Sequence, residues 1–105
     1  MYQLIYISSA TKSLAREEFL ELVAHSKSKN TAMGITGILM FKDGNFMQVL
    51  EGKQELIAKL YSTIKVDSRH TLVSIIQEGL INLREYPGWS STYFNSEEGQ
   101  YEVIC

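Results

Sequence analysis

The sequence predicts an α+β fold in which two helices pack on one face of a mixed sheet. Strand-like and helical segments follow in the order strand, helix, strand, strand, helix, strand. Asp43 and Gly44 separate two apolar segments, and this dipeptide is typical of a tight hairpin because both residues tolerate positive φ. The order is the split βαβ arrangement of ferredoxin-like domains, βαββαβ, optionally followed by one more strand. Right-handed crossovers then bring both helices to the same face.

The composition indicates one globular domain. The 105 residues are 45% hydrophobic and 21% charged, with a single proline. A chain of this length forms one core and is too short for two. We expect residues 1–95 to form the domain and residues 96–105 to form a C-terminal tail.

The N-terminal third contains the first strand and the first helix. Residues 3–8 are rich in Leu, Ile and Tyr on both alternating faces, which indicates a central strand. Ser13 is the candidate N-cap of the helix, and Glu17 and Glu18 follow in its first turn. Apolar side chains then recur at helical spacing, and we expect the helix to end near residues 28–30.

The middle of the chain contains the hairpin and the second helix. Residues 35–42 and 45–51 are predicted strands on either side of the Asp-Gly turn. In residues 53–64, apolar side chains fall on one helical face.

The remaining segments are shorter. Residues 67–70 are predicted as a loop, and residues 71–77 as the fourth strand. A short fifth strand is expected within residues 86–94, entered through a Pro-Gly pair, while residues 95–99 are polar and predict a turn or a frayed end.

Charge and composition exclude several classes of function. The net charge is −2 without a basic cluster, which disfavours nucleic-acid binding. No apolar segment approaches the length of a membrane span, and the N-terminus does not resemble a signal peptide, so we expect a cytoplasmic protein. Cys105 is the only cysteine, and His25 and His70 have no clustered partners, so no metal site is expected.

Gln48 is the most informative residue of the third predicted strand. Strand alternation places it on one face with Phe46 and Leu50, so a primary amide lies in an apolar row. Each buried group left without a hydrogen bond costs roughly 1–3 kcal/mol. Tyr6, on the adjacent strand, offers a phenol if it also faces the helices. Such a pair can exchange donor and acceptor when the amide rotates or tautomerises, and a switch requires a bistable element of this kind.

Each candidate residue also has an ordinary structural interpretation. Asn30 alone is typical of a helix C-cap, and Trp89 alone is typical of a core aromatic residue. Arg69 and His70 alone are typical of a solvated loop. A functional interpretation therefore depends on their combination.

In combination, five ordered motifs resemble the BLUF family, the sensors of blue light using flavin adenine dinucleotide. The resemblance runs from about Tyr2 to Trp89, with matching separations between the motifs. The motifs are Leu4-Ile-Tyr-Ile-Ser8, Asn30 with Gly34-Ile-Thr-Gly37, Phe46-Met-Gln-Val-Leu-Glu-Gly52, Asp67-Ser-Arg-His70 and Tyr86-Pro-Gly-Trp89.

The resemblance implies a blue-light photoreceptor that is not an enzyme and that binds FAD, with FMN or riboflavin as alternatives. Tyr6 would donate an electron and then a proton to the excited flavin, and rearrangement of the Gln48 amide would store the signal. The resemblance also implies that Asn30 and Arg69 contact the edge of the flavin ring, with Asp67 and His70 as helpers. Leu22 and Ile64 would contact the two faces of the ring, and Trp89 would be the switch tryptophan. Further positions in the flavin pocket would be Phe46, Leu39 and Ser8.

Two positions depart from the family pattern. Ser91 stands where many members have a methionine two residues after the tryptophan, and Lys29 stands where a histidine often precedes the asparagine. We expect these changes to affect the lit-state lifetime, the colour or the output.

The sheet face without helices is expected to be apolar. Ile5, Ile7, Met47 and Val49 should project from it, together with alternating residues of 38–40. Many stand-alone family members cover this face with two C-terminal helices, and an open apolar patch is unfavourable in water. We therefore expect a homo-oligomer or an effector protein on this face, or a chain truncated relative to the working protein.

Two other classes of function share the predicted fold. A flavin-free interaction module would use the open sheet face for a partner. An acylphosphatase-like hydrolase would need an Arg-bearing, Gly-rich loop after the first strand, and residues 8–12 contain neither Gly nor Arg.

Overall fold

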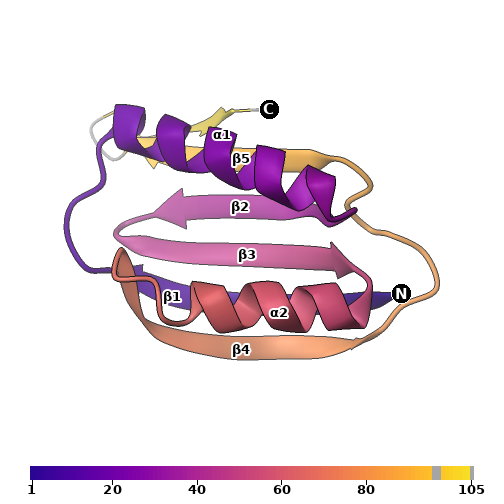
Figure 1. Ribbon diagram of the computed structural model, residues 1–105. Helices are drawn as coiled ribbons and strands as arrows, with labels where there is room; N and C mark the ends of the chain where they lie inside the picture. The colour runs from indigo at the N-terminus through magenta and orange to yellow at the C-terminus, as the bar shows by residue number, and fades with distance from the viewer. Residues whose placement is uncertain (96–97, 105) are drawn as a thin grey trace.

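The computed structural model describes residues 1–95 and 98–104 and contains a sheet of six strands (Figure 1). Its elements are β1 (Tyr2–Ala10), α1 (Arg16–Ala32), β2 (Thr36–Lys42), β3 (Asn45–Gly52), α2 (Gln54–Ile64), β4 (His70–Leu80), β5 (Trp89–Asn95) and β6 (Gln100–Val103). The strand order is β4-β1-β3-β2-β5-β6, so β1 and β3 are neighbours near the centre. Among the described strands, β2 and β5 alone pair in parallel, which makes the sheet mixed. The predicted α+β, ferredoxin-like fold is confirmed.

Both helices cover the same face of the sheet (Figure 1). Helix α2 packs on β1 and β3, and α1 packs on β2 and β5. The core is correspondingly divided into two clusters of buried side chains, one around Leu50 and Ile57 under α2 and one around Phe19 and Phe41 under α1. Trp89 packs against both clusters, so it lies where the two parts of the core meet.

The start of α1 differs from the prediction. The helix begins at Arg16 with Ala15 at the N-cap position, so the assignment of Ser13 as the cap was wrong. The Glu18 carboxylate accepts a hydrogen bond from the Ala15 backbone N–H at 3.1 Å. Glu18 thus supplies one half of a capping box, the contact to the backbone N–H of the cap residue, and Ala15 has no side-chain acceptor for the other half.

The end of α1 also lies beyond the predicted boundary. The helix continues to Ala32, with Met33 at the C-cap position, so Asn30 lies inside the last turn. Gly34 takes the left-handed conformation (φ 68°) and donates a backbone hydrogen bond to the Thr31 carbonyl at 3.0 Å. Because glycine adopts this conformation without strain, Asn30 is not required as the cap.

The hairpin is confirmed, since Asp43 and Gly44 both have positive φ (51° and 79°) between β2 and β3. The predicted tail contains β6, which pairs antiparallel with β5. Residues 96–97, within the predicted turn at 95–99, lie outside the described residues. The division into a domain of residues 1–95 and a tail stays a prediction.

The sheet face without helices is only partly open. Ile7 is 42% exposed, whereas Val49 is 2% exposed between its register partners Ile5 and Ile38. Val49 is enclosed by its neighbours on β1 and β2, so the apolar surface that is open on this face is smaller than the sequence suggested. Within the described part of the chain, no helix is long and apolar enough to span a membrane.

Candidate functional site

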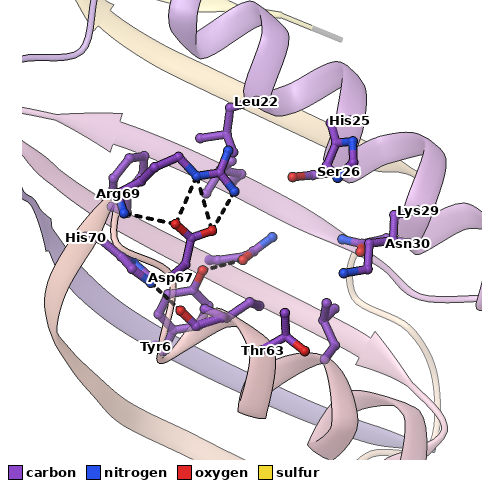
Figure 2. A pocket seen from close by; sticks show the side chains of 15 residues that line it. Tyr6, Leu22, His25, Ser26, Lys29, Asn30, Thr63, Asp67, Arg69 and His70 are labelled. Carbon is purple, nitrogen blue, oxygen red and sulfur yellow. Dashed lines mark hydrogen bonds and ion pairs between the residues drawn. The ribbon is translucent and has the colours of Figure 1, made fainter.

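A cavity of about 260 Å³ lies between α1 and α2 above the middle of the sheet (Figure 2). Its walls come from β1, β2, β3, both helices, the loop before β4 and the first residue of β4. The lining residues are Tyr6, Leu22, His25, Ser26, Lys29, Asn30, Leu39, Phe46, Gln48, Leu60, Thr63, Ile64, Asp67, Arg69 and His70. Most of the residues predicted for the site from separate motifs thus meet in one cavity.

Tyr6 and Gln48 form a buried hydrogen-bonded pair on the cavity floor. They are register partners on β1 and β3, and each is 4% exposed. The Tyr6 hydroxyl donates to Gln48 Oε1 at 2.5 Å. Among the described residues the Gln48 Nε2 group has no hydrogen-bond partner, so the amide offers its N–H groups to whatever occupies the cavity.

The surroundings of Tyr6 keep its phenol protonated. Its ring makes edge contacts with Tyr61 and His70, with ring centroids 5.9 Å and 6.2 Å apart. Burial raises the pKa of Tyr6 above its ordinary value, and Tyr61 and Asp67 add to that effect. Desolvation disfavours the phenolate, so the hydroxyl remains a hydrogen-bond donor to Gln48.

The raised pKa of Tyr6 predicts a loss of stability in alkali. The folded protein holds this proton more tightly than the unfolded chain, where the pKa is 10.0. The stabilisation is complete below that value, and the free energy of unfolding should fall as the pH rises above it. Urea unfolding from neutral pH into this range measures the effect. Tyr6→Phe should show a smaller decline than the unsubstituted protein, and equal declines would contradict the assignment.

The two helices contribute apolar side chains and one buried amide to the cavity. Leu22 lies on α1 and Ile64 at the end of α2, and both line the cavity, while their contacts to two ring faces stay a prediction. Asn30 is 3% exposed at the end of α1, and its side-chain amide has no partner among the described residues. A buried amide of this kind requires a hydrogen-bonding group from a ligand or from water.

Arg69 and Asp67 form an ion pair at the mouth of the cavity (Figure 2). Arg69 Nη2 and Nε donate to the Asp67 carboxylate at 2.5 Å and 3.0 Å, and the Arg69 backbone N–H donates at 2.9 Å. These hydrogen bonds lower the pKa of Asp67 to about 2. Asp67 therefore orients the guanidinium, and the Nη1 group remains without a partner among the described residues.

His70 and Ser8 connect the cavity wall to the sheet. The His70 Nε2 group donates to the Ile64 carbonyl oxygen at 2.5 Å, and Nδ1 hydrogen-bonds the Ser8 hydroxyl at 2.8 Å. Ser8 is buried and is not among the residues that line the cavity. With both ring nitrogens engaged, His70 fixes the end of α2 against β1.

Trp89 also lies outside the cavity lining. Its Nε1 atom is buried without a hydrogen-bond partner among the described residues, and the same is true of the Ser91 hydroxyl. The switch role implied for Trp89 stays a prediction.

The structure adds cavity residues for which the sequence analysis proposed no site role. His25, Ser26 and Lys29 follow Leu22 at helical spacing on α1, and Leu60 and Thr63 lie on α2. The positions of His25, Ser26 and Lys29, three, four and seven residues after Leu22, are a sequence signal that could have indicated them.

Comparison with known proteins shows the family to which the chain belongs. Residues 1–92 match the family BLUF, described as sensors of blue-light using FAD. Subunit beta of the photoactivated adenylate cyclase of Euglena longa is 35% identical over 95 residues, which cover 90% of this chain and 11% of that protein. The blue light- and temperature-regulated antirepressor BluF of Escherichia coli (strain K12) is 34% identical over 67 residues, which cover 64% of this chain and 17% of that protein.

Solved structures show the same architecture. A bacterial light-regulated adenylyl cyclase superposes with a TM-score of 0.83 at 34% identity, over 91% of this chain and 28% of that one. Klebsiella pneumoniae BlrP1 with FMN and cyclic diGMP superposes with a TM-score of 0.73 at 37% identity, over 79% of this chain and 22% of that one.

The match covers most of the chain, and it places the chain in the class of blue-light sensor domains. The chain belongs to the BLUF family. It spans only about 11% of the length of the cyclase subunit named above.

Proposed function

We propose that this chain is a blue-light photoreceptor that binds a flavin in the cavity between α1 and α2. The hydrogen bond from Tyr6 to Gln48, with the other end of the Gln48 amide open to the cavity, is the observation that carries this proposal. The pair connects a redox-active phenol to a group that can change its hydrogen-bonding direction.

The residues around the cavity suit an isoalloxazine ring. Such a ring has flat apolar faces and an edge rich in hydrogen-bond acceptors. Leu22 and Ile64 supply aliphatic surfaces from opposite helices, while Asn30, Gln48 Nε2 and Arg69 Nη1 supply donors without protein partners among the described residues. When bound and excited by blue light, the flavin supplies a strong oxidant beside these groups. The family description favours FAD, and FMN and riboflavin share the ring that these contacts would recognise.

In the proposed photocycle, Tyr6 would give up an electron to the excited flavin held in the cavity, and its hydroxyl proton would pass to Gln48 Oε1 as Gln48 Nε2 passes a proton on toward the flavin. The Gln48 amide then rotates or tautomerises, which exchanges its donor and acceptor ends. Tyr6 recovers its electron and proton, and Gln48 keeps the new arrangement until it reverts in darkness. No substrate is consumed, so the lasting change is one of hydrogen bonding, and we propose that the chain is not an enzyme.

The dark absorption spectrum and the blue-light-minus-dark difference spectrum test this proposal on protein reconstituted with FAD. We expect a bound flavin whose absorption shifts slightly to the red in light and returns in darkness. A chain that binds no flavin would instead be a partner-binding member of the family. A bound flavin without a reversible shift would contradict the Tyr6 and Gln48 mechanism.

The signal requires a partner, and we propose that it is read on the sheet face without helices. Ile7 is exposed there, and Met47 is half-buried. A second copy of the chain or an effector protein would cover these side chains. Mass measurement in solution at micromolar concentration distinguishes them, because a monomer would exclude the second copy.

A further inference from the structure

Three of the motifs in the sequence contain residues that the cavity does not use. These are the glycine-bounded segment 34–37, the Glu51-Gly52 pair and the segment 86–89. Hydrogen bonds bring parts of all three segments together at the end of β3. Glu51 is at their centre, and it is 0% exposed.

The buried Glu51 carboxylate is held by three N–H groups. Gln3 Nε2 donates to Oε2 at 2.8 Å, the Glu85 backbone N–H donates to Oε2 at 3.0 Å, and the Tyr86 backbone N–H donates to Oε1 at 2.8 Å. Hydrogen bonds to a charged acceptor are stronger than neutral ones. Two of these donors belong to the loop between β4 and β5, so the carboxylate ties that loop to β3.

Arg84 ties the same loop to two further places. Its Nη1 group donates to the Thr36 hydroxyl at 2.6 Å and to the Glu51 backbone carbonyl at 2.8 Å. Its Nη2 group donates to the Gly34 carbonyl at 2.9 Å. The loop is therefore fixed to the turn after α1, to the start of β2 and to the end of β3.

Fixing this loop also determines where Trp89 begins β5. Only Pro87 and Gly88 separate Tyr86 from Trp89, and the Gly88 carbonyl accepts the Gly37 N–H at 3.3 Å. The Trp89 Nε1 group has no hydrogen-bond partner among the described residues. The indole is held by packing alone, so its place depends on the backbone that carries it.

We propose that Glu51 is a positioning residue whose carboxylate sets the place of Trp89 by holding the backbone of residues 85 and 86. Glu51 and Gln48, the hydrogen-bond partner of Tyr6, lie on the same strand, β3. The hydrogen bond from the Tyr86 backbone N–H to Glu51 therefore also connects β3 to the start of β5. The consequence for light signalling rests on the proposed function, whereas the placement of Trp89 in the dark does not.

Glu51→Gln tests this inference with little change in side-chain volume. The amide has one acceptor oxygen, and its NH₂ group must face an N–H donor of Gln3 or of the loop. We expect the amides of Glu85 and Tyr86 to exchange with solvent roughly tenfold faster or more, because a hydrogen bond to a charged group is lost. We also expect the emission of Trp89, the single tryptophan, to shift to the red as the indole becomes more exposed.

Glu55→Gln is the matched control, because Glu55 is exposed on α2 and the substitution removes the same charge. It should leave both readouts unchanged. A folded Glu51→Gln protein with the Trp89 emission and the loop exchange of the unsubstituted protein would overturn the proposal.

A second measurement covers the case in which Glu51→Gln does not fold. In the unsubstituted protein, the amides of Glu85 and Tyr86 should exchange more slowly than that of Leu83, which lies in the same loop and is 80% exposed. Equal exchange at the three amides would show that the carboxylate does not hold the loop, and the proposal would be wrong.

The flavin-loaded protein separates this inference from the proposed function. If the chain binds flavin, we expect Glu51→Gln to change the rate of dark recovery, while Glu55→Gln should not. If the chain binds no flavin, the proposed function fails, and the exchange and emission measurements still decide the role of Glu51.

Discussion

Tyr6→Phe is expected to bind flavin and to show no light-induced red shift. The side chain is 4% exposed, and its hydroxyl forms the hydrogen bond to Gln48 Oε1. Phenylalanine nearly conserves the volume of the cavity wall, so the flavin site should remain intact. It has no ionisable hydroxyl, so neither the electron nor the proton transfer to the excited flavin can follow the proposed route. The difference spectrum under blue light measures this loss.

Tyr61→Phe is the control for that experiment. Tyr61 lies beside Tyr6, with a ring centroid distance of 5.9 Å, and it does not line the cavity. Removing its hydroxyl should leave the photocycle in place. A shift of full amplitude in Tyr6→Phe would remove Tyr6 from the proposed role, and loss of the shift in both variants would indicate a general effect on the α2 packing.

Gly37→Ala is expected to destabilise the domain by roughly 3 kcal/mol or more, because overpacking against backbone and backbone strain act together. A Cβ atom at this position would lie 1.8 Å from the Val49 carbonyl oxygen and 2.8 Å from its carbonyl carbon. The φ angle of 156° is also one that L-residues rarely adopt. Because β2 pairs with both β3 and β5 at this residue, relief of the clash must separate strands. Urea unfolding measures the loss.

Gly79→Ala provides the comparison for Gly37→Ala. Gly79 lies in β4, and a Cβ atom there would meet nothing within 4 Å. Its effect on the free energy of unfolding should remain within about 1 kcal/mol, as for most substitutions away from tight packing. Similar losses in the two variants would contradict the close approach of β2 to β3.

Local sequence patterns predicted the strands and helices because each depends on near neighbours. The Asp43-Gly44 turn is an example, since two adjacent residues supply the required φ angles. Element ends were less predictable. Ser13 and Asn30 were reasonable caps by residue type, but Ala15, two residues beyond Ser13, is at the N-cap position of α1, and Gly34 takes the left-handed conformation after the helix.

The sequence by itself determined the order of elements, the face on which Gln48 lies and the family resemblance that selected the candidate residues. Strand alternation and helical periodicity carry that information over a few residues. Only the tertiary structure decided that the Tyr6 hydroxyl reaches Gln48, that Ser8 contacts His70 and does not line the cavity, and that the Glu51 carboxylate holds Glu85 and Tyr86. These contacts join residues 34 to 62 positions apart. Their geometry depends on how the strands and loops pack against one another, and local sequence patterns do not predict that packing.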